Sequence, residues 1–66
     1  MDPTATWNEM VEAVVSANWE IAADLAAVLL AWLGKEGFPP AISGHPVFDR
    51  IVARETCEAI AAWDVK

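Results

Sequence analysis

The stretch DLAAVLLAWL, residues 24–33, decides the fold because it is apolar on nearly every side of a helix. Within it Leu25, Leu29 and Trp32 recur three and four residues apart, which is the spacing of one helix face. A helix that is apolar all round has to be covered by neighbours on more than one face. We therefore expect this segment to be the central helix of an all-α fold. The run is about half as long as a membrane-spanning helix requires, so we expect a core helix and no anchor.

One segment rich in glycine and proline, residues 37–45, separates this helix from the C-terminal part of the chain. Gly37 suits the left-handed cap that ends many helices, and the two prolines after Phe38 prevent continuation. In such a Schellman motif Phe38 would fold back onto Leu33. Pro46 then fits the first position of another helix. We therefore interpret this segment as a linker between two helices.

The N-terminal flank offers two helix starts. Thr6 is followed three residues later by Glu9, a pairing in which each side chain can cap the other residue's backbone N–H. Asp2 with Pro3 is an alternative start, because proline fits the first helical position. We expect the helix to start at Thr6, with a boundary four residues earlier as the alternative. Its apolar face comprises Trp7, Met10, Val11, Val14 and Val15.

Residues 16–18 determine whether the N-terminal half is a hairpin or a rod. Ser16 and Asn18 are good caps and poor helix interiors, although nothing there forbids a continuous helix. Either the chain turns here and a second helix begins near Asn18, or one long helix runs to about Glu36 and needs a partner along its length. We favour the turn.

Residues 17–22, with the sequence Ala-Asn-Trp-Glu-Ile-Ala, resemble the turn of a tetratricopeptide hairpin, where a small residue, a polar cap and an aromatic precede the second helix. The resemblance covers about residues 6–34. Glu9 and Met10 stand where the family has a Leu-Gly pair, and Gly34 stands where it has proline. Such repeats need about three stacked copies, and this chain holds one. The resemblance implies a protein-binding or self-stacking hairpin and no chemistry.

The C-terminal segment predicts a helix with Pro46 at its first position and Asp49 in its first turn, where a carboxylate opposes the helix dipole. One side of its helical wheel is apolar, and we expect that side to be buried. It comprises Phe48, Val52, Ala59 and Trp63, flanked by Ile51 and Ile60. The opposite side carries Arg50, Arg54 and Glu58.

Glu55 is the unusual charge of this helix, because the wheel places it between Phe48 and Ile51 on the side expected to be buried. A buried carboxylate needs a partner or a raised pKa. We favour a structural role, in which it pairs with His45, Lys35 or an arginine or reaches solvent from the helix edge, over a role as a functional acid.

These patterns together predict a small all-α domain spanning residues 1–66. It would contain three helices, arranged as a helical hairpin plus a returning C-terminal helix. Their approximate ranges are 6–16, 18–36 and 46–63, with the linker at 37–45. The expected core comprises Leu25, Leu29, Trp32, Phe48, Val52 and Trp63.

The chain is short enough that its fold needs additional stabilisation, which small domains draw from disulfides, a metal or a partner subunit. A single cysteine, Cys57, cannot form an internal disulfide, and with one histidine, His45, it falls short of a four-ligand zinc site. Because 56% of the 66 residues are apolar, we expect contact with a protein partner or a homo-oligomer, although the many alanines weaken that pressure.

The charge balance is acidic. Ten acidic and four basic residues give a net charge of −6, which would repel nucleic-acid phosphates and an anionic membrane surface. We therefore expect neither nucleic acid nor membrane as a partner. Asp2 follows Met1 where a secretory leader would carry positive charge, so we expect a cytoplasmic protein.

Cys57, His45 and Glu55 could suggest catalysis, as a thiol nucleophile, an imidazole base and an orienting acid. However, Cys57 and Glu55 are two residues apart on a helix and point in different directions, and no glycine-rich loop or oxyanion motif accompanies them. We expect Cys57 to be a small core or interface residue and His45 to bracket a helix start. The sequence predicts no enzymatic activity, no cofactor and no metal site.

Several side chains are candidates for contact with a partner. Four tryptophans can hardly all be buried in so small a domain, and Trp19, beside the turn, is the one we expect at a partner contact. The stiff apolar linker could dock in a groove of another chain, although we favour its packing across its own helices. The candidate partner-binding residues are Trp19, Phe38, Pro39, Pro40, Ile42 and Glu55.

The sequence therefore favours an interaction role. The first hypothesis is a protein-protein interaction or self-associating module without catalytic activity. The alternative is a small acidic inhibitor or antitoxin-like protein that covers a basic or substrate-binding surface of a larger target. Binding that weakens steeply with ionic strength would favour the alternative.

Overall fold

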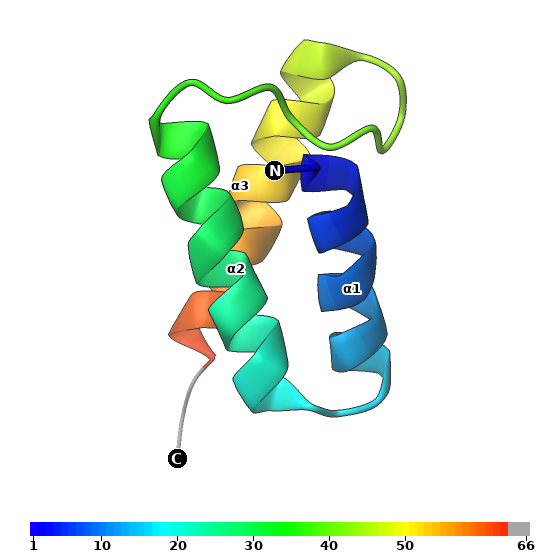
Figure 1. The fold of residues 1–66 in the computed structure, drawn as a ribbon, viewed down its shortest axis with the longest axis vertical. Helices are drawn as coiled ribbons and strands as arrows, with labels where there is room; N and C mark the ends of the chain where they lie inside the picture. The colour runs from blue at the N-terminus through cyan, green and yellow to red at the C-terminus, as the bar shows by residue number, and fades with distance from the viewer. Residues whose placement is uncertain (64–66) are drawn as a thin grey trace.

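The computed structural model describes residues 1–63, which form three α-helices. They are α1 (Pro3–Val15), α2 (Trp19–Gly34) and α3 (Pro46–Ala62). α2 packs against both other helices, and Figure 1 shows a tight turn joining α1 to α2 at one end while the longer loop before α3 crosses the other end. The predicted all-α fold, with a hairpin, a returning third helix and a central second helix, is confirmed. No helix within residues 1–63 has the length and apolar character that a membrane crossing requires.

α1 begins at Pro3 because Asp2 caps it. The Asp2 carboxylate accepts hydrogen bonds from the backbone N–H groups of Thr4 at 3.0 Å and Ala5 at 3.3 Å. Pro3 fills the first helical position, where its missing N–H costs nothing. The predicted start at Thr6 is therefore wrong, and the alternative start at Asp2 and Pro3 is confirmed. Thr6 lies inside the helix and donates through Oγ1 to the Asp2 carbonyl at 3.2 Å.

The turn between α1 and α2 falls where the sequence predicts it. Ala17 adopts a left-handed conformation with φ of 58°. Its N–H donates to the Val14 carbonyl at 3.0 Å, and the N–H of Asn18 donates to the Ala13 carbonyl at 2.7 Å. This pair of bonds is a Schellman motif, which ends α1 and reverses the chain. The long-rod alternative is therefore wrong.

α2 also ends in a Schellman motif, but its left-handed residue is Glu36, with φ of 67°, and not Gly37 as predicted. The N–H of Glu36 donates to the Leu33 carbonyl at 3.0 Å, and that of Gly37 donates to the Trp32 carbonyl at 2.9 Å. We expected Phe38 to fold back onto Leu33, and the structure packs its ring on Trp32. The centroids of these two rings lie 5.6 Å apart, edge to face. Gly37 is needed because a Cβ there would lie 2.3 Å from the Trp32 indole.

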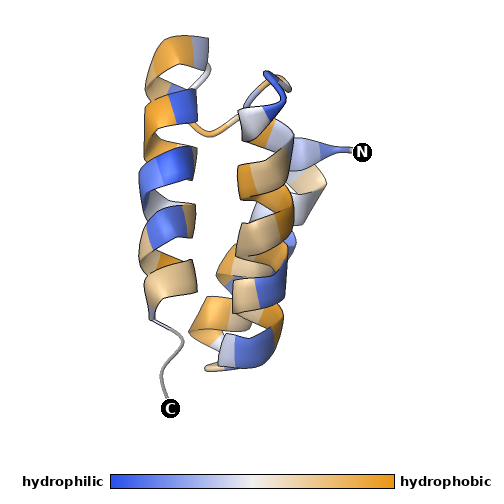
Figure 2. Cartoon of the chain, turned by 90° about the vertical axis from the view of Figure 1, so that its left-hand side faces the viewer, coloured by the Kyte–Doolittle hydropathy of each residue, from blue (hydrophilic) through white to orange (hydrophobic). Residues whose placement is uncertain are grey.

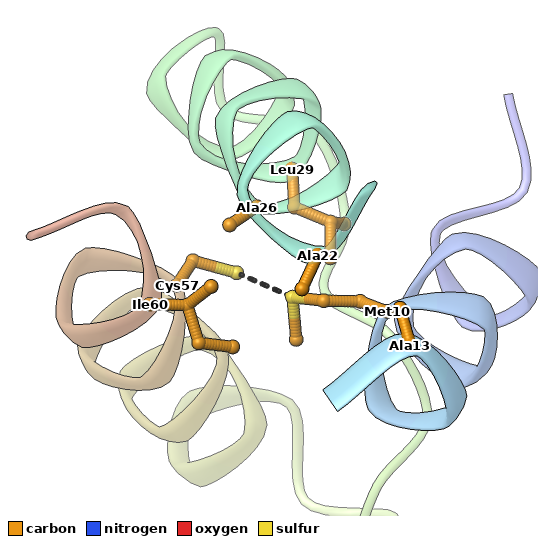
Figure 3. Packing of buried hydrophobic residues seen from close by; sticks show 7 residues of the cluster. All are labelled: Met10, Ala13, Ala22, Ala26, Leu29, Cys57 and Ile60. Carbon is orange, nitrogen blue, oxygen red and sulfur yellow. Dashed lines mark hydrogen bonds between the residues drawn. The ribbon is translucent and has the colours of Figure 1, made fainter. Parts of the chain in front are cut away.

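The core is small and draws on all three helices, as Figure 3 shows. Its alanines let the helices approach closely, while the larger side chains fill the centre. The buried cluster comprises Met10, Ala13, Ala22, Ala26, Leu29, Cys57 and Ile60. Of the predicted core, Leu29 is confirmed as fully buried, whereas Leu25 and Trp32 are only half-buried.

α3 is rotated by about one residue from the predicted orientation. Its buried residues are Asp49, Ala53, Cys57 and Ile60. The prediction that Phe48, Val52 and Trp63 lie in the core is therefore wrong for Phe48 and Trp63, which are exposed, and Val52 is half-buried. Figure 2 shows hydrophobic ribbon along the outer edge of the upper part of α3, the helix at the left. The physical reason for this rotation is Asp49, whose carboxylate points inward because it accepts hydrogen bonds from the preceding loop.

Asp49 anchors that loop. Its carboxylate accepts hydrogen bonds from the N–H groups of Ile42, Ser43 and Gly44 at 3.1, 2.8 and 3.1 Å, and from the Ser43 hydroxyl at 2.6 Å. The residue is only 2% exposed. Burial disfavours its charge, but the bonds from the Ser43 hydroxyl and the three backbone N–H groups outweigh that effect and hold the pKa of Asp49 below its ordinary value.

Candidate functional site

An apolar groove of about 450 Å³ runs between α1 and α3. It exists because α2 packs against both of these helices, whereas they contact each other far less. α1 contributes Met10, Val11, Val14 and Val15. α3 contributes Glu55, Thr56, Ala59, Ile60 and Trp63.

The groove has a buried floor and open walls. Met10 and Ile60 are buried in the core and form the floor. On the walls, Val15 is 80% exposed and Trp63 is 56% exposed. Apolar side chains that remain in water are stabilised when another apolar surface covers them, by roughly 25 cal/mol per Å². The groove is therefore suited to bind an apolar surface of another molecule that covers these exposed walls.

Sequence reasoning did not identify this groove, because it expected the apolar side of the third helix, with Ala59 and Trp63, to be buried. Val11 and Val15 of α1 are exposed, and Trp7 and Val14 are half-buried. The signal was present in the sequence: α1 and α3 both carry wide apolar faces, and the single helix between them can cover only part of each.

Glu55 is the one ionisable residue among the described residues that line the groove. Its side chain is 65% exposed, so the prediction that it lies on the buried side of the helix is wrong. The reason is the rotation of α3, which moves Glu55 to the edge of the groove. The expected pairing with an arginine is found, since Arg54 Nη2 lies 3.9 Å from Glu55 Oε2. Both side chains are exposed, so this pair is weak.

Trp19, the tryptophan expected at a partner contact, lies next to the groove. Its ring centroid is 5.0 Å from that of Trp63, with the planes tilted by 60°. Because Trp63 lines the groove, the two indoles form one aromatic surface at this end of the molecule. Trp19 and Glu55 are therefore the two predicted partner-binding residues that the structure places at or beside the groove.

The other four predicted residues lie in the loop before α3, at the opposite end of α3 from Trp63 (Figure 1). Pro40 is fully buried and Pro39 half-buried, while Phe38 and Ile42 are exposed. The structure therefore does not bring the six candidates together.

That loop packs across its own helices, as we favoured. The N–H of Ala41 donates to Thr4 Oγ1 at 3.0 Å, and Arg50 Nη2 donates to the Gly37 carbonyl at 2.7 Å. Together with Asp49, these contacts tie the loop to both α1 and α3.

Cys57, His45 and Glu55 do not converge on one site. Cys57 is completely buried, its Sγ lies 3.8 Å from Met10 Sδ, and burial raises the pKa of the thiol to about 11. His45 is exposed at the start of α3, about 18 Å along the helix axis from Cys57. Cys57 is thus confirmed as a small core residue. Within residues 1–63 no three His, Cys, Asp or Glu side chains gather as a ligand set.

Comparison of the chain with known protein families, with curated proteins and with solved structures gives no match.

Proposed function

We propose that this chain is a protein-interaction module without catalytic activity, and that the groove between α1 and α3 binds a helix of a protein partner. The observation that carries the proposal is the groove itself, with a buried apolar floor and exposed apolar walls on two helices. A helix lying there would contact α1 and α3 on the side away from α2. The arrangement would then resemble a four-helix bundle, in which each helix buries an apolar face against its neighbours.

The exposure of the walls favours a helix over a small molecule. Pockets for small molecules cover most of the surface of their ligand. Here Val11, Val15 and Trp63 stand open to solvent, so a small apolar molecule on the floor would leave them uncovered. A helix about 10 Å across with its side chains can contact the floor and both walls at once.

The surroundings of Cys57 argue against a mechanism in which its thiol acts as a nucleophile. The thiol of Cys57 is protonated near neutral pH, because its pKa is raised to about 11, and a protonated thiol is a poor nucleophile. Among residues 1–63 the hydrogen-bond partner of this thiol is the thioether of Met10, which is not a base. The resemblance of residues 17–22 to a tetratricopeptide turn stays a prediction, and it favours the same class of role.

The net charge of −6 favours a second candidate, an acidic inhibitor or antitoxin-like protein that binds a basic surface of a larger target. The two candidates differ in what they require of the groove. Ala59→Glu places a charge on the apolar wall of the groove and would weaken helix docking. The same substitution would leave binding through an acidic surface unchanged or make it tighter.

A neutral amphipathic peptide tests the proposed function. It carries leucine at positions i, i+3, i+4 and i+7 of a helix and glutamine or serine elsewhere. Titrated into the isotopically labelled chain, it should shift the amide resonances of Val11–Val15 and Glu55–Trp63 in a saturable way. Ala59→Glu should weaken binding roughly tenfold or more, by removing apolar contact and burying a charge.

The matched control for this experiment is Ala61→Glu. Ala61 is exposed on the same helix and is not among the residues that line the groove. It adds the same charge, so it should leave peptide binding within about twofold of the original chain. Resonance shifts that are absent at millimolar peptide, or that cluster away from α1 and α3, would refute the proposed function.

A further inference from the structure

We infer that the helix bound by the groove is basic along one edge of its apolar face, with a Lys or Arg that pairs with Glu55. This inference rests on the proposed function and specifies the chemistry of the partner. It follows from where charge lies around the groove.

Glu55 is placed to receive a cation from outside the chain. It lines the groove, and more than half of its side chain is exposed. Its contact with Arg54 is long, at 3.9 Å, and an exposed pair of that kind contributes little. Arg54 also lines a separate surface beside α2, together with Arg50 and Glu58. The Glu55 carboxylate therefore keeps most of its capacity to accept hydrogen bonds at the groove edge.

No described cation of the chain lines the groove to oppose a basic partner. Arg50 is engaged with the carbonyls of Leu33 and Gly37, and Lys35 lies beside Trp32 at the far end of α2. The whole chain has a net charge of −6. A basic helix is therefore attracted at long range by the net charge and at short range by Glu55.

The same charges disfavour a second copy of this chain as the occupant. Two copies that met groove to groove would be related by a two-fold axis, so each would present the same surface to the other. Both Glu55 carboxylates would then lie in one largely apolar interface, with no cation among the described residues that line the groove. Like charges are costly in such a place, and the net charges of the two copies would repel as well.

Three peptides with the same apolar face test the inference. They carry lysine, glutamine or glutamate at the two edge positions, and binding is measured by isothermal titration calorimetry. We expect the lysine peptide to bind about threefold to fivefold tighter than the glutamine peptide, and the glutamate peptide to bind weakest. Raising the salt from about 20 mM to about 300 mM should remove most of the difference.

A pair of variants separates the contribution of Glu55 to the lysine preference from the contribution of the net charge. Glu55→Gln should abolish most of the preference for lysine over glutamine. Glu9→Gln removes the same charge from α1 at a position away from the groove, so it should retain the preference. Glu55→Lys should reverse the order and favour the glutamate peptide.

The outcomes distinguish this inference from the proposed function. If all three peptides bind equally well, or if Glu55→Gln and Glu9→Gln have the same effect, the groove binds helices and the inference is wrong. If none of the peptides binds, the proposed function is refuted and the inference with it. If the chain alone forms a dimer that Ala59→Glu dissociates, the occupant is a second copy and the basic partner is excluded.

Discussion

Adding one methyl group at Gly37 should destabilise the fold measurably, because that position lies against an indole ring. A Cβ on Gly37 would lie 2.3 Å from Trp32 Cε2 and 2.5 Å from Trp32 Nε1. Both distances are far inside van der Waals contact. Gly37→Ala must therefore displace the ring, which donates through Nε1 to the Phe38 carbonyl at 2.8 Å and packs edge to face on the Phe38 ring.

The expected loss can be worked from those two contacts. A neutral hydrogen bond contributes about 1 kcal/mol, and an aromatic pair about 1 kcal/mol beyond its buried area. Alanine also lowers the conformational entropy of the unfolded chain relative to glycine, which stabilises the folded state by about 0.5 kcal/mol. The free energy of unfolding should therefore fall by about 1.5 kcal/mol. In a domain of this size that corresponds to a drop in Tm of roughly 6–12 °C.

Urea and thermal unfolding followed by circular dichroism measure this change, and Gly34→Ala is the control. A Cβ on Gly34 meets nothing within 4 Å, and Gly34 is the last residue of α2. Alanine there should raise the free energy of unfolding by about 0.5–1 kcal/mol. The same substitution three residues apart is thus expected to act with opposite signs. If Gly37→Ala proves as stable as Gly34→Ala, the packing of Trp32 on this loop is wrong.

Three further outcomes are expected. The hydrogen bonds to Asp49 stabilise the fold when its carboxylate is ionised, so the original chain should have a higher free energy of unfolding than Asp49→Asn. This difference should be full above about pH 4 and disappear as the pH falls through the lowered pKa of Asp49. Urea unfolding across acidic pH measures the difference, and a difference that persists at the lowest pH would contradict the expectation. Cys57 should not react with a disulfide reagent at about pH 8 until urea unfolds the chain, because its thiol is buried and its pKa is raised to about 11; fast reaction of the native chain would show that the core opens. Ala17→Gly should raise the free energy of unfolding by about 0.5–1 kcal/mol, since φ of 58° strains alanine and suits glycine, and a lower stability would argue against the left-handed turn.

The number and order of the helices could be predicted from local pattern. The Ala- and Leu-rich run around Leu29 has no polar face and so must be central, and the glycine and proline of residues 37–45 exclude a helix. Ser16 and Asn18 mark the turn by their capping preference alone. Each of these signals acts within a few residues of the feature that it specifies, which is why it can be read without the fold.

The inward face of α3 could not be predicted in this way. A wheel ranks positions by hydrophobicity, and it places Phe48 above Asp49 for burial. In the fold Asp49 is buried because three N–H groups of the preceding loop need an acceptor, and its carboxylate satisfies all of them. Ala53 and Cys57 then follow inward, since they lie one and two turns further along the same face. The hydrogen bonds to Asp49 therefore fix which face of α3 points inward, and in that orientation Glu55 lies at the groove edge.

The sequence predicted that the apolar face of α3 lies in the core of the domain. In the structure most of that face is exposed, because α3 is rotated. Two of its members, Ala59 and Trp63, line the groove. Phe48 and Val52 continue the same helix face toward the loop, at spacings of four and seven residues. A hydrophobic pattern reports every surface that leaves water, whether it is covered by the same chain or by another. Ala59 and Trp63 are therefore the part of this face that the proposed partner helix would cover.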